Sequence, residues 1–322
     1  MTTSTLPRRA GTTALLALAS ALACSGGDGE TGETGETAGE DITGVVFTRR
    51  SSDCADYVND YTATARDIQR DQEFAATVSV SQDGSQCVFE SNTIPNHDFD
   101  DATASFATPV AEVPRTLSIP RNPSAAAAPT GLTLDSLDAV MLNGVVVDLF
   151  SAGCWNVGDG FIGCFELNTP WRKDPMHPSN TFGADAHHAH TQPDGTYHYH
   201  GDPVAMWDES PGDNGSPVIG FAADGFPIYG GYFNDGGNLR RAVSGYTLKP
   251  GTRPSGADGP GGAYDGTYID DFEFTGAGDL DECNGMTVDG QYGYYVTDAY
   301  PWLLRCFHGT PDPSFKKMMG AP

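Results

Sequence analysis

Short runs of alternating hydrophobic and polar residues recur along most of the chain, with glycine- and proline-rich turns between them. Residues 75–90 hold two such runs on either side of Asp83-Gly84, and Asp-Gly in that setting predicts a hairpin because glycine accepts a positive φ. Residues 140–150 are apolar enough for a buried strand, and residues 216–232 predict two short strands around a turn. The pattern predicts a mainly β fold: a single large antiparallel β-rich domain with many short strands and hairpins and little helix.

One segment departs from this alternation. In residues 53–70, four apolar residues follow the spacing of a helix face: Tyr57, Tyr61, Ala65 and Ile68. This spacing predicts the one appreciable helix of the chain. Residues 62–65 also alternate as a strand does, so a strand is the alternative. Residues 120–129, with their alanine run, predict a surface connection within one domain.

The first 40 residues predict export and attachment to a membrane. A pair of arginines precedes an apolar run too short to span a bilayer, so residues 1–23 are typical of a signal peptide. Cys24 follows a lipobox-like sequence and is expected to carry lipid, with residues 24–40 as a flexible acidic Gly/Thr/Glu tether. An ordinary signal peptide with an incidental cysteine is the alternative. We expect a lipoprotein held in an outer leaflet or outer membrane, facing the periplasm or the cell exterior, with residues 41–322 as the β-rich domain.

The other cysteines and the charge narrow the chemistry. An even number of cysteines in an exported chain suggests disulfides, and sequence proximity favours three pairs: Cys54–Cys87, Cys154–Cys164 and Cys283–Cys306. The net charge of −26 argues against nucleic acid as a partner, because phosphate binding needs patches of lysine and arginine. Acidic loops at residues 270–273 and 279–283 offer oxygen ligands for calcium, but neither matches an EF-hand.

The strongest candidate chemistry lies in residues 185–200, which contain five of the eight histidines. Alternate residues of a strand share a face, so His198 and His200 form one pair of imidazoles, and His188 and His190 form another before the intervening turn. Folding about that turn predicts four converging imidazoles, and nitrogen-rich ligation suits zinc or copper as the cofactor. A hydrogen-bonded histidine network without metal is the alternative.

Four further residues are weaker candidates for the same site. Asp185 is expected to be a ligand or to support one. His187 fits less well, because alternation places it on the face opposite to His188. Asp224 is favoured as a turn residue over a ligand, and His97 is distant in sequence and typical of a satisfied core or surface histidine.

An Asp-Gly-x-Tyr sequence begins at Asp194, Asp265 and Asp289. Two of the three copies continue with a second tyrosine two residues later. In residues 289–295 both tyrosines recur, but a glycine and a tyrosine replace the two histidines of residues 194–200. The shared tyrosines therefore predict scaffold, and the histidines predict the chemistry that the first copy adds.

The Tyr-His-Tyr-His sequence of residues 197–200, followed by residues 220–230, resembles the bacterial YHYH domain family, which is named for the first motif. Other segments that resemble the family are residues 94–97, 141–145, 280–285 and 300–310. The resemblance implies an exported bacterial protein with one domain over most of the mature chain, and it supplies no reaction. It matches His198 and His200 to the naming motif and gives His97 more weight as a ligand.

Three functions stay open on these observations. A metal-dependent hydrolase or oxidoreductase needs an open coordination position, whereas a metal-capture or sensing protein predicts a site closed by four protein ligands. A calcium-dependent adhesion or glycan-binding module would use aromatic contact surfaces and the acidic loops. We expect a cell-surface or periplasmic lipoprotein with a zinc or copper site, and leave its reaction and its small-molecule or surface partner open.

Overall fold

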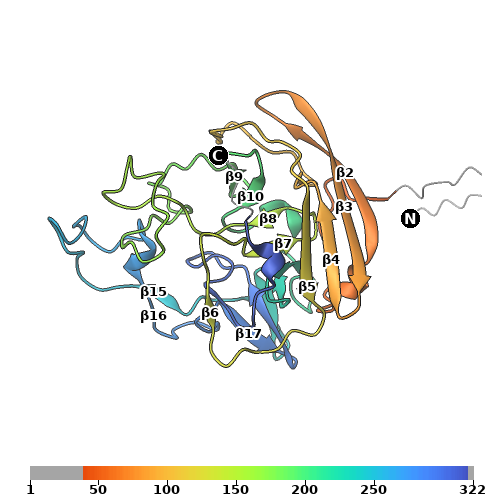
Figure 1. The fold of residues 1–322 in the computed structure, drawn as a ribbon. Coiled ribbons are helices and arrows are strands. Elements are labelled where there is room, and N and C mark those ends of the chain that lie inside the picture. The colour runs from red at the N-terminus through yellow and green to blue at the C-terminus, as the bar shows by residue number, and fades with distance from the viewer. Residues whose placement is uncertain (1–38, 318–322) are drawn as a thin grey trace, which may run out of the picture. The chain divides into compact units, whose positions relative to one another are not determined.

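The first part of the chain forms a five-stranded sheet, drawn mainly in orange in Figure 1. Its strands lie side by side in chain order: β1 (Glu40–Asp41), β2 (Asn59–Asp67), β3 (Gln72–Asp83), β4 (Gln86–Ser91) and β5 (Arg115–Pro120). The computed structural model describes residues 39–317, so the predicted signal peptide, Cys24 and most of the tether lie outside the described residues. Glu40, which the sequence assigns to the tether, pairs with Tyr61 in the sheet.

The antiparallel pair of β3 and β4 confirms the hairpin predicted in residues 75–90. The helix predicted over residues 53–70 is wrong. A short 3-10 helix, η1 (Cys54–Tyr57), is followed directly by β2, which pairs with β3 along its whole length. Ala63, Ala65 and Asp67 are buried at every second position, so burial in a sheet prevailed over the chance helical spacing of the apolar residues.

An eight-stranded sheet forms the second layer and carries the histidine segment. Its strands are β7 (Ala139–Met141), β8 (Val146–Val147), β9 (Ala189–Thr191), β10 (Tyr197–Tyr199), β11 (Val218–Ala222), β12 (Pro227–Tyr229), β17 (Gly285–Val288) and β18 (Gln291–Tyr295). The two strands predicted in residues 216–232 are β11 and β12. The single strand predicted in residues 140–150 is instead a hairpin of β7 and β8, because Asn143-Gly144 turns the chain with a Gly144 φ of 81°.

The eight-stranded sheet has the same plan on both sides of its centre. Its order is β17-β18-β12-β11-β7-β8-β10-β9. At each end lies an antiparallel hairpin whose inner strand pairs in parallel with a strand of a central hairpin, β10 with β8 and β18 with β12. We call β7 to β10 the histidine half, and β11, β12, β17 and β18 the tyrosine half.

The two halves also agree in register. Tyr199 of β10 pairs with Val147, and Tyr294 of β18 pairs with Ile228. Each of these partners lies four residues after the first residue of a turn, Asn143-Gly144 in one half and Asp224-Gly225 in the other. Because of this internal match, each strand position in one half has a counterpart in the other half.

Buried aromatic residues join the two sheets. Phe221 of β11 contacts Tyr57 and Phe89 of the first layer, with ring centroids 5.7 and 6.2 Å apart. A side chain at Gly144 would collide with Val78 of β3, 2.6 Å from the position of its Cβ, so glycine at this turn permits the close approach of the sheets. The histidine half is therefore held against the five-stranded sheet through its turn.

The remaining elements are short. Three two-stranded sheets pair β13 (Tyr232–Asp235) with β14 (Asn238–Arg241), β15 (Tyr246–Leu248) with β16 (Phe272–Phe274), and β6 (Thr130–Gly131) with β19 (Cys306–Phe307). The other 3-10 helices are η2 (Val204–Met206), η3 (Ile269–Asp271) and η4 (Pro313–Phe315). Among residues 39–317, no helix has the length and apolar character to cross a bilayer.

All three predicted disulfides are confirmed: Cys54–Cys87, Cys154–Cys164 and Cys283–Cys306. They link η1 to β4, close one loop, and join the segment just before β17 to β19. The mainly β fold with little helix is also confirmed, and most strand pairs are antiparallel. Parallel pairing, which the sequence did not indicate, occurs in β1–β2, β8–β10 and β12–β18.

Candidate metal centre

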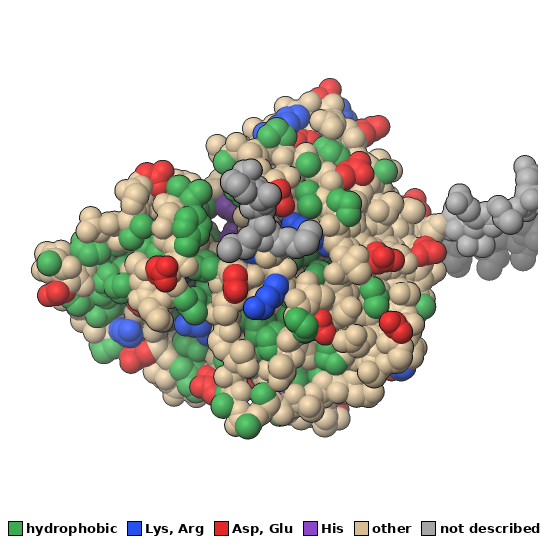
Figure 2. Space-filling view, in the orientation of Figure 1, with side chains coloured by type: hydrophobic (Ala, Val, Ile, Leu, Met, Phe, Trp, Pro, Cys, Tyr) green, Lys and Arg blue, Asp and Glu red, His purple; other side chains and the backbone are tan. Residues whose placement is uncertain are grey.

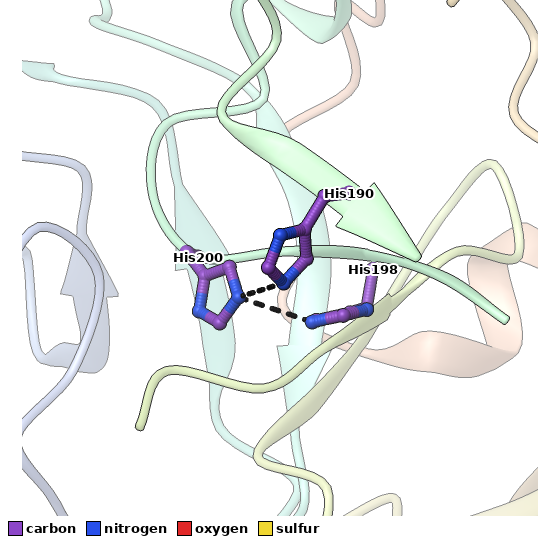
Figure 3. Close-up of side chains that lie close together, drawn as sticks. All are labelled: His190, His198 and His200. Atoms are coloured by element: carbon purple, nitrogen blue, oxygen red, sulfur yellow. Dashed lines mark hydrogen bonds between the residues drawn. The ribbon is translucent and has the colours of Figure 1, made fainter. Parts of the chain in front are cut away.

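Three histidines project from one face of the β9–β10 hairpin (Figure 3). His190 of β9 lies directly opposite His198 of β10 in the antiparallel register, so their side chains share a face. His200 follows His198 by two residues and returns to the same face. The pairing of one turn-linked hairpin thus brings three imidazoles together.

The Nε2 atoms of these histidines converge on one point. The Nε2 of His200 lies 2.9 Å from that of His190 and 3.1 Å from that of His198. Nitrogen ligands about 2.0–2.1 Å from a tetrahedral zinc ion stand roughly 3.3 Å from each other. The observed spacing is therefore close to that of three ligands on one ion.

Burial keeps all three imidazoles neutral. It lowers the pKa of His198 and of His200 well below 6.5, with a further lowering from a neighbouring histidine, and it lowers the pKa of His190. The Nδ1 of His190 donates to the Phe182 carbonyl at 2.7 Å, and that of His198 faces the Thr196 carbonyl at 3.3 Å. These bonds leave Nε2 as the lone-pair atom of both rings.

The hydrogen bonding within the trio is incomplete. His200 Nδ1 is buried and makes no hydrogen bond of good geometry, although the nearby backbone of Leu149 raises the pKa of this ring slightly against the effect of burial. If His200 carries its proton on Nε2, it can serve the two neighbouring lone pairs only by sharing one hydrogen, and its Nδ1 stays unsatisfied. If it carries the proton on Nδ1, three lone pairs face one another. A cation at the point of convergence removes the repulsion, so the residues present fit a metal.

His188, predicted as the fourth ligand, lies outside this trio. Its backbone has a φ of 58°, so the chain is not extended there and β9 begins only at Ala189. The period-two alternation that pairs it with His190 therefore fails. Its Nδ1 is 2.9 Å from the Asp202 carbonyl.

Asp185, His187 and His97 lie on the opposite face of β10, with its two tyrosines. Asp185 accepts hydrogen bonds from the backbone N–H of His187 at 3.0 Å and from the hydroxyl of Tyr197 at 2.8 Å, so it caps the turn before β9. The ring centroids of His97 and His187 lie 3.9 Å apart, and the two rings are tilted by 39° to each other. His97 Nε2 lies 2.7 Å from the Tyr199 hydroxyl. These three candidates therefore lie on the tyrosine face of β10, away from the trio.

Asp224 is a turn residue, as the sequence favoured. Its carboxylate accepts hydrogen bonds from the hydroxyl of Tyr294 at 2.6 Å and from the N–H groups of Gly309 and Phe226 at 2.8 and 3.3 Å. The acidic loops are engaged in the same way. Asp271 accepts from the guanidinium of Arg253, and Asp279 accepts from that of Arg240.

Asp148 lines the same cavity as the trio, and the sequence pattern does not indicate it. It follows Val147, the register partner of Tyr199, so it lies beside His200 on the neighbouring strand. Its Oδ2 accepts from Lys317 at 2.5 Å and from Gln192 at 2.7 Å, while Oδ1 has no partner. No local pattern signals this neighbour, because the parallel pairing of β8 with β10 brings it there from some fifty residues away.

A second buried carboxyl lies next to Asp148. Burial and the charge of Asp148 raise the pKa of Asp138 to about 8. This raised pKa favours the protonated form of Asp138, whose Oδ2 accepts from the N–H of Leu149 at 2.7 Å. Burial also raises the pKa of Asp148, and the bond from the Lys317 ammonium opposes that rise.

A cavity of about 610 Å³ opens in front of the trio. It is lined by His190, His198, His200, Asp148, Lys317 and several phenylalanines. In Figure 2, histidine side chains are visible at the base of a hollow, with hydrophobic side chains beside it. Three imidazoles on one side and open space on the other leave room for an additional ligand on a bound metal.

The family model named YHYH protein matches residues 116–309, more than half of the chain of 322 residues. The chain therefore belongs to the YHYH family. The match includes the trio, Asp148 and both halves of the eight-stranded sheet. No curated protein and no solved structure matches the chain.

Proposed function

We propose that this protein is an exported transition-metal protein that binds zinc or copper through His190, His198 and His200, with a coordination position open to the cavity. The observation that carries the proposal is the convergence of three Nε2 atoms, with those of His190 and His198 lying 2.9 and 3.1 Å from that of His200. Imidazole nitrogen is a preferred ligand of both metals and a poor one for calcium. Disulfides and membership of a family associated with exported proteins support an oxidising location.

The arrangement favours chemistry or exchange at the metal over storage. Storage sites are closed by four protein ligands, whereas three histidines with an accessible position are typical of catalytic metal sites. The alternative of a calcium-dependent adhesion module has weaker support, because arginines already occupy the carboxylates of Asp271 and Asp279. The reaction itself is left unassigned.

The decisive measurement is the metal content of the untagged mature chain. We expect about one zinc or copper ion per chain by elemental analysis. The His198→Ala/His200→Ala double variant and the His190→Ala variant should lose it, while His188→Ala should retain it. Circular dichroism and thermal unfolding check that each variant is folded. If the wild type takes up neither metal even after reconstitution, the proposal fails, and stoichiometric calcium alone would favour the adhesion module.

Anchoring through Cys24 is a separate proposal. It rests on the lipobox-like sequence and the polar segment that follows. Mass spectrometry of the protein from native membranes should find Cys24 as the lipid-modified N-terminal residue. An unmodified thiol at Cys24 would refute the anchor without affecting the metal proposal.

A further inference from the structure

We propose that the cavity in front of the trio binds a small amphipathic organic anion, with one carboxylate at the metal and an apolar body of aromatic size against the outer wall. This inference rests on the proposed metal centre and names the class of ligand that it receives. Its volume of about 610 Å³ falls in the range of small-molecule sites, roughly 300–1,000 Å³.

The outer wall is apolar and exposed. Phe161, Ile162 and Phe165 are 38%, 56% and 68% exposed, and all three line the cavity. They belong to one short loop at its mouth. Several large apolar side chains exposed together mark a contact surface, whereas isolated ones need no explanation. Phe150 and Phe182 continue the apolar wall inward.

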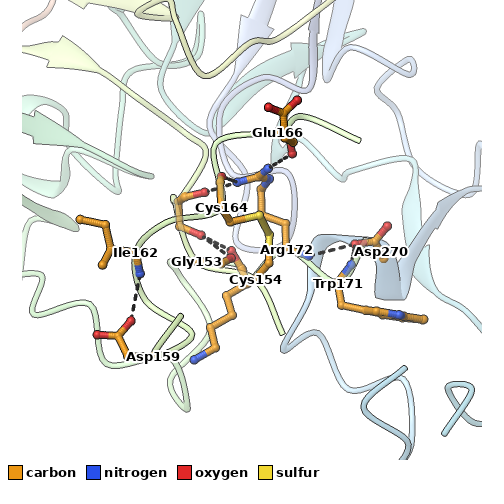
Figure 4. The surroundings of a disulfide bond; sticks show 11 residues. Gly153, Cys154, Asp159, Ile162, Cys164, Glu166, Trp171, Arg172 and Asp270 are labelled. Atoms are coloured by element: carbon orange, nitrogen blue, oxygen red, sulfur yellow. Dashed lines mark hydrogen bonds between the residues drawn. A yellow bond between two sulfur atoms is a disulfide. The ribbon is translucent and has the colours of Figure 1, made fainter. Parts of the chain in front are cut away.

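The loop that carries this wall is fixed in shape (Figure 4). The Cys154–Cys164 disulfide closes it, and Asp159 accepts hydrogen bonds from the N–H groups of Phe161 and Ile162 at 2.8 and 3.2 Å. A wall that is rigid before binding loses little entropy when a ligand arrives.

A buried arginine holds the far side of the same loop. Arg172 is 1% exposed, and its guanidinium donates to the carbonyls of Ser151, Cys164 and Glu166 at 2.6, 3.0 and 3.0 Å. Burying a cation mainly against carbonyls is costly, and the charge of Asp270 offsets only part of the cost. That cost is borne at a loop that lines the cavity, which supports a role for the shape of the loop in binding.

The inner end of the cavity is left with positive charge once a metal is bound. An imidazole that binds a metal through Nε2 adds no charge of its own, and the ammonium of Lys317 is paired with the carboxylate of Asp148 at 2.5 Å. A divalent ion therefore keeps its two charges, and within residues 39–317 no fourth side chain joins the trio. A carboxylate from the ligand supplies both the missing ligand atom and a compensating charge.

Cobalt substitution tests the proposal, because zinc has no visible spectrum and cobalt(II) reports its own ligands. The mature chain is loaded with cobalt(II) and titrated with 4-phenylbutyrate, acetate or 4-phenylbutanol while the visible bands are followed. We expect 4-phenylbutyrate to bind at least about tenfold tighter than either of the others, since a buried phenyl group contributes that much. The Ile162→Ser/Phe165→Ser variant should lose about tenfold for 4-phenylbutyrate and nothing for acetate.

Ile68→Ser is the matched control, because Ile68 is 49% exposed and does not line the cavity. It should bind all three probes like the wild type. Equal affinities for acetate and 4-phenylbutyrate, or an unaffected double variant, would refute the apolar wall. If 4-phenylbutanol binds as tightly as 4-phenylbutyrate, the proposed requirement for an anionic group is refuted. Cobalt uptake without any response to the probes overturns this inference alone, whereas a chain that binds none of zinc, copper and cobalt overturns the proposed function and this inference with it.

Discussion

In the histidine half of the eight-stranded sheet, the face of β10 that carries His198 borders the cavity. In the tyrosine half, the corresponding face of β18 packs against aromatic rings. His198 corresponds to Gly293, where a side chain would lie 2.5 Å from the ring of Tyr229. The neighbours Asp148 and His200 correspond to Tyr229 and Tyr295, whose rings are stacked 5.1 Å apart.

The other face is the same in both halves. The rings of Tyr197 and Tyr199 meet edge to face at 5.7 Å and 75°, and those of Tyr292 and Tyr294 meet at 5.6 Å and 84°. The hydroxyl of the second tyrosine bonds to the turn residue of its half, Asn143 or Asp224 in turn, at 3.0 and 2.6 Å. One scaffold thus serves both halves, and the proposed metal ligands occupy positions that the scaffold does not need.

The largest expected effect tests the shared scaffold. Tyr199→Ala and Tyr294→Ala each remove a fully buried ring, so each should lower the free energy of unfolding by about 3–5 kcal/mol. Urea unfolding with the disulfides intact measures both. A loss below about 1 kcal/mol in one half alone would break the equivalence of the two halves.

The second prediction tests the face on which the halves differ. His198→Gly introduces the residue that the tyrosine half has there, and it should weaken zinc binding by more than about 100-fold, since even supporting residues of a metal site contribute 10–100-fold. Competition with a chromophoric chelator measures the affinity. His188→Gly is the control: at a φ of 58° glycine is favourable, so fold and affinity should persist. Equal losses in both variants would restore His188 as a ligand.

The third prediction compares the hydrogen bonds that the second tyrosine hydroxyl makes in each half. Tyr294→Phe removes a hydroxyl from the buried carboxylate of Asp224 and should cost about 1–3 kcal/mol, because bonds to charged groups are the stronger ones. Tyr199→Phe removes a hydroxyl shared by the neutral groups of Asn143 and His97, and should cost about 0.5–1.5 kcal/mol. Urea unfolding at one pH measures both, and the reverse order would contradict this assignment of charge.

The sequence predicts the elements whose pattern is local, and it misses what depends on pairing at a distance. The hairpin in residues 75–90 and the trio members His198 and His200 follow from alternation alone. The predicted position of His188 beside His190 is wrong, because a single positive φ removes His188 from the strand. Nothing in the pattern signals where β9 begins. Asp148 was missed because a parallel neighbour, separated by some fifty residues, places it beside His200.

The smallest effect is the pH dependence of the metal-free protein between pH 6.5 and 5.5. Unfolded histidine takes up a proton near pH 6.5, but burial lowers the pKa of His198 and His200 far below that value in the folded state. The unfolded chain therefore binds more protons as the pH falls, and each such histidine lowers the stability by about 1 kcal/mol between pH 6.5 and 5.5. Asp138 acts in the opposite sense: its folded pKa of about 8 exceeds the unfolded value of 3.8, so it adds stability as the pH falls from 8 toward 4.

The slope of unfolding free energy against pH separates these groups. His198→Ala should reduce the wild-type slope between pH 6.5 and 5.5 by about 1 kcal/mol per pH unit, because fewer protons are taken up on unfolding. Asp138→Asn should steepen the slope by about 1.4 kcal/mol per pH unit, since the opposing proton is gone while the neutral shape of the side chain is kept. An unchanged slope in His198→Ala would mean that this imidazole is protonated in the folded protein. The three Nε2 atoms would then be joined by a proton, and the hydrogen-bonded network would replace the metal as the reason for their convergence.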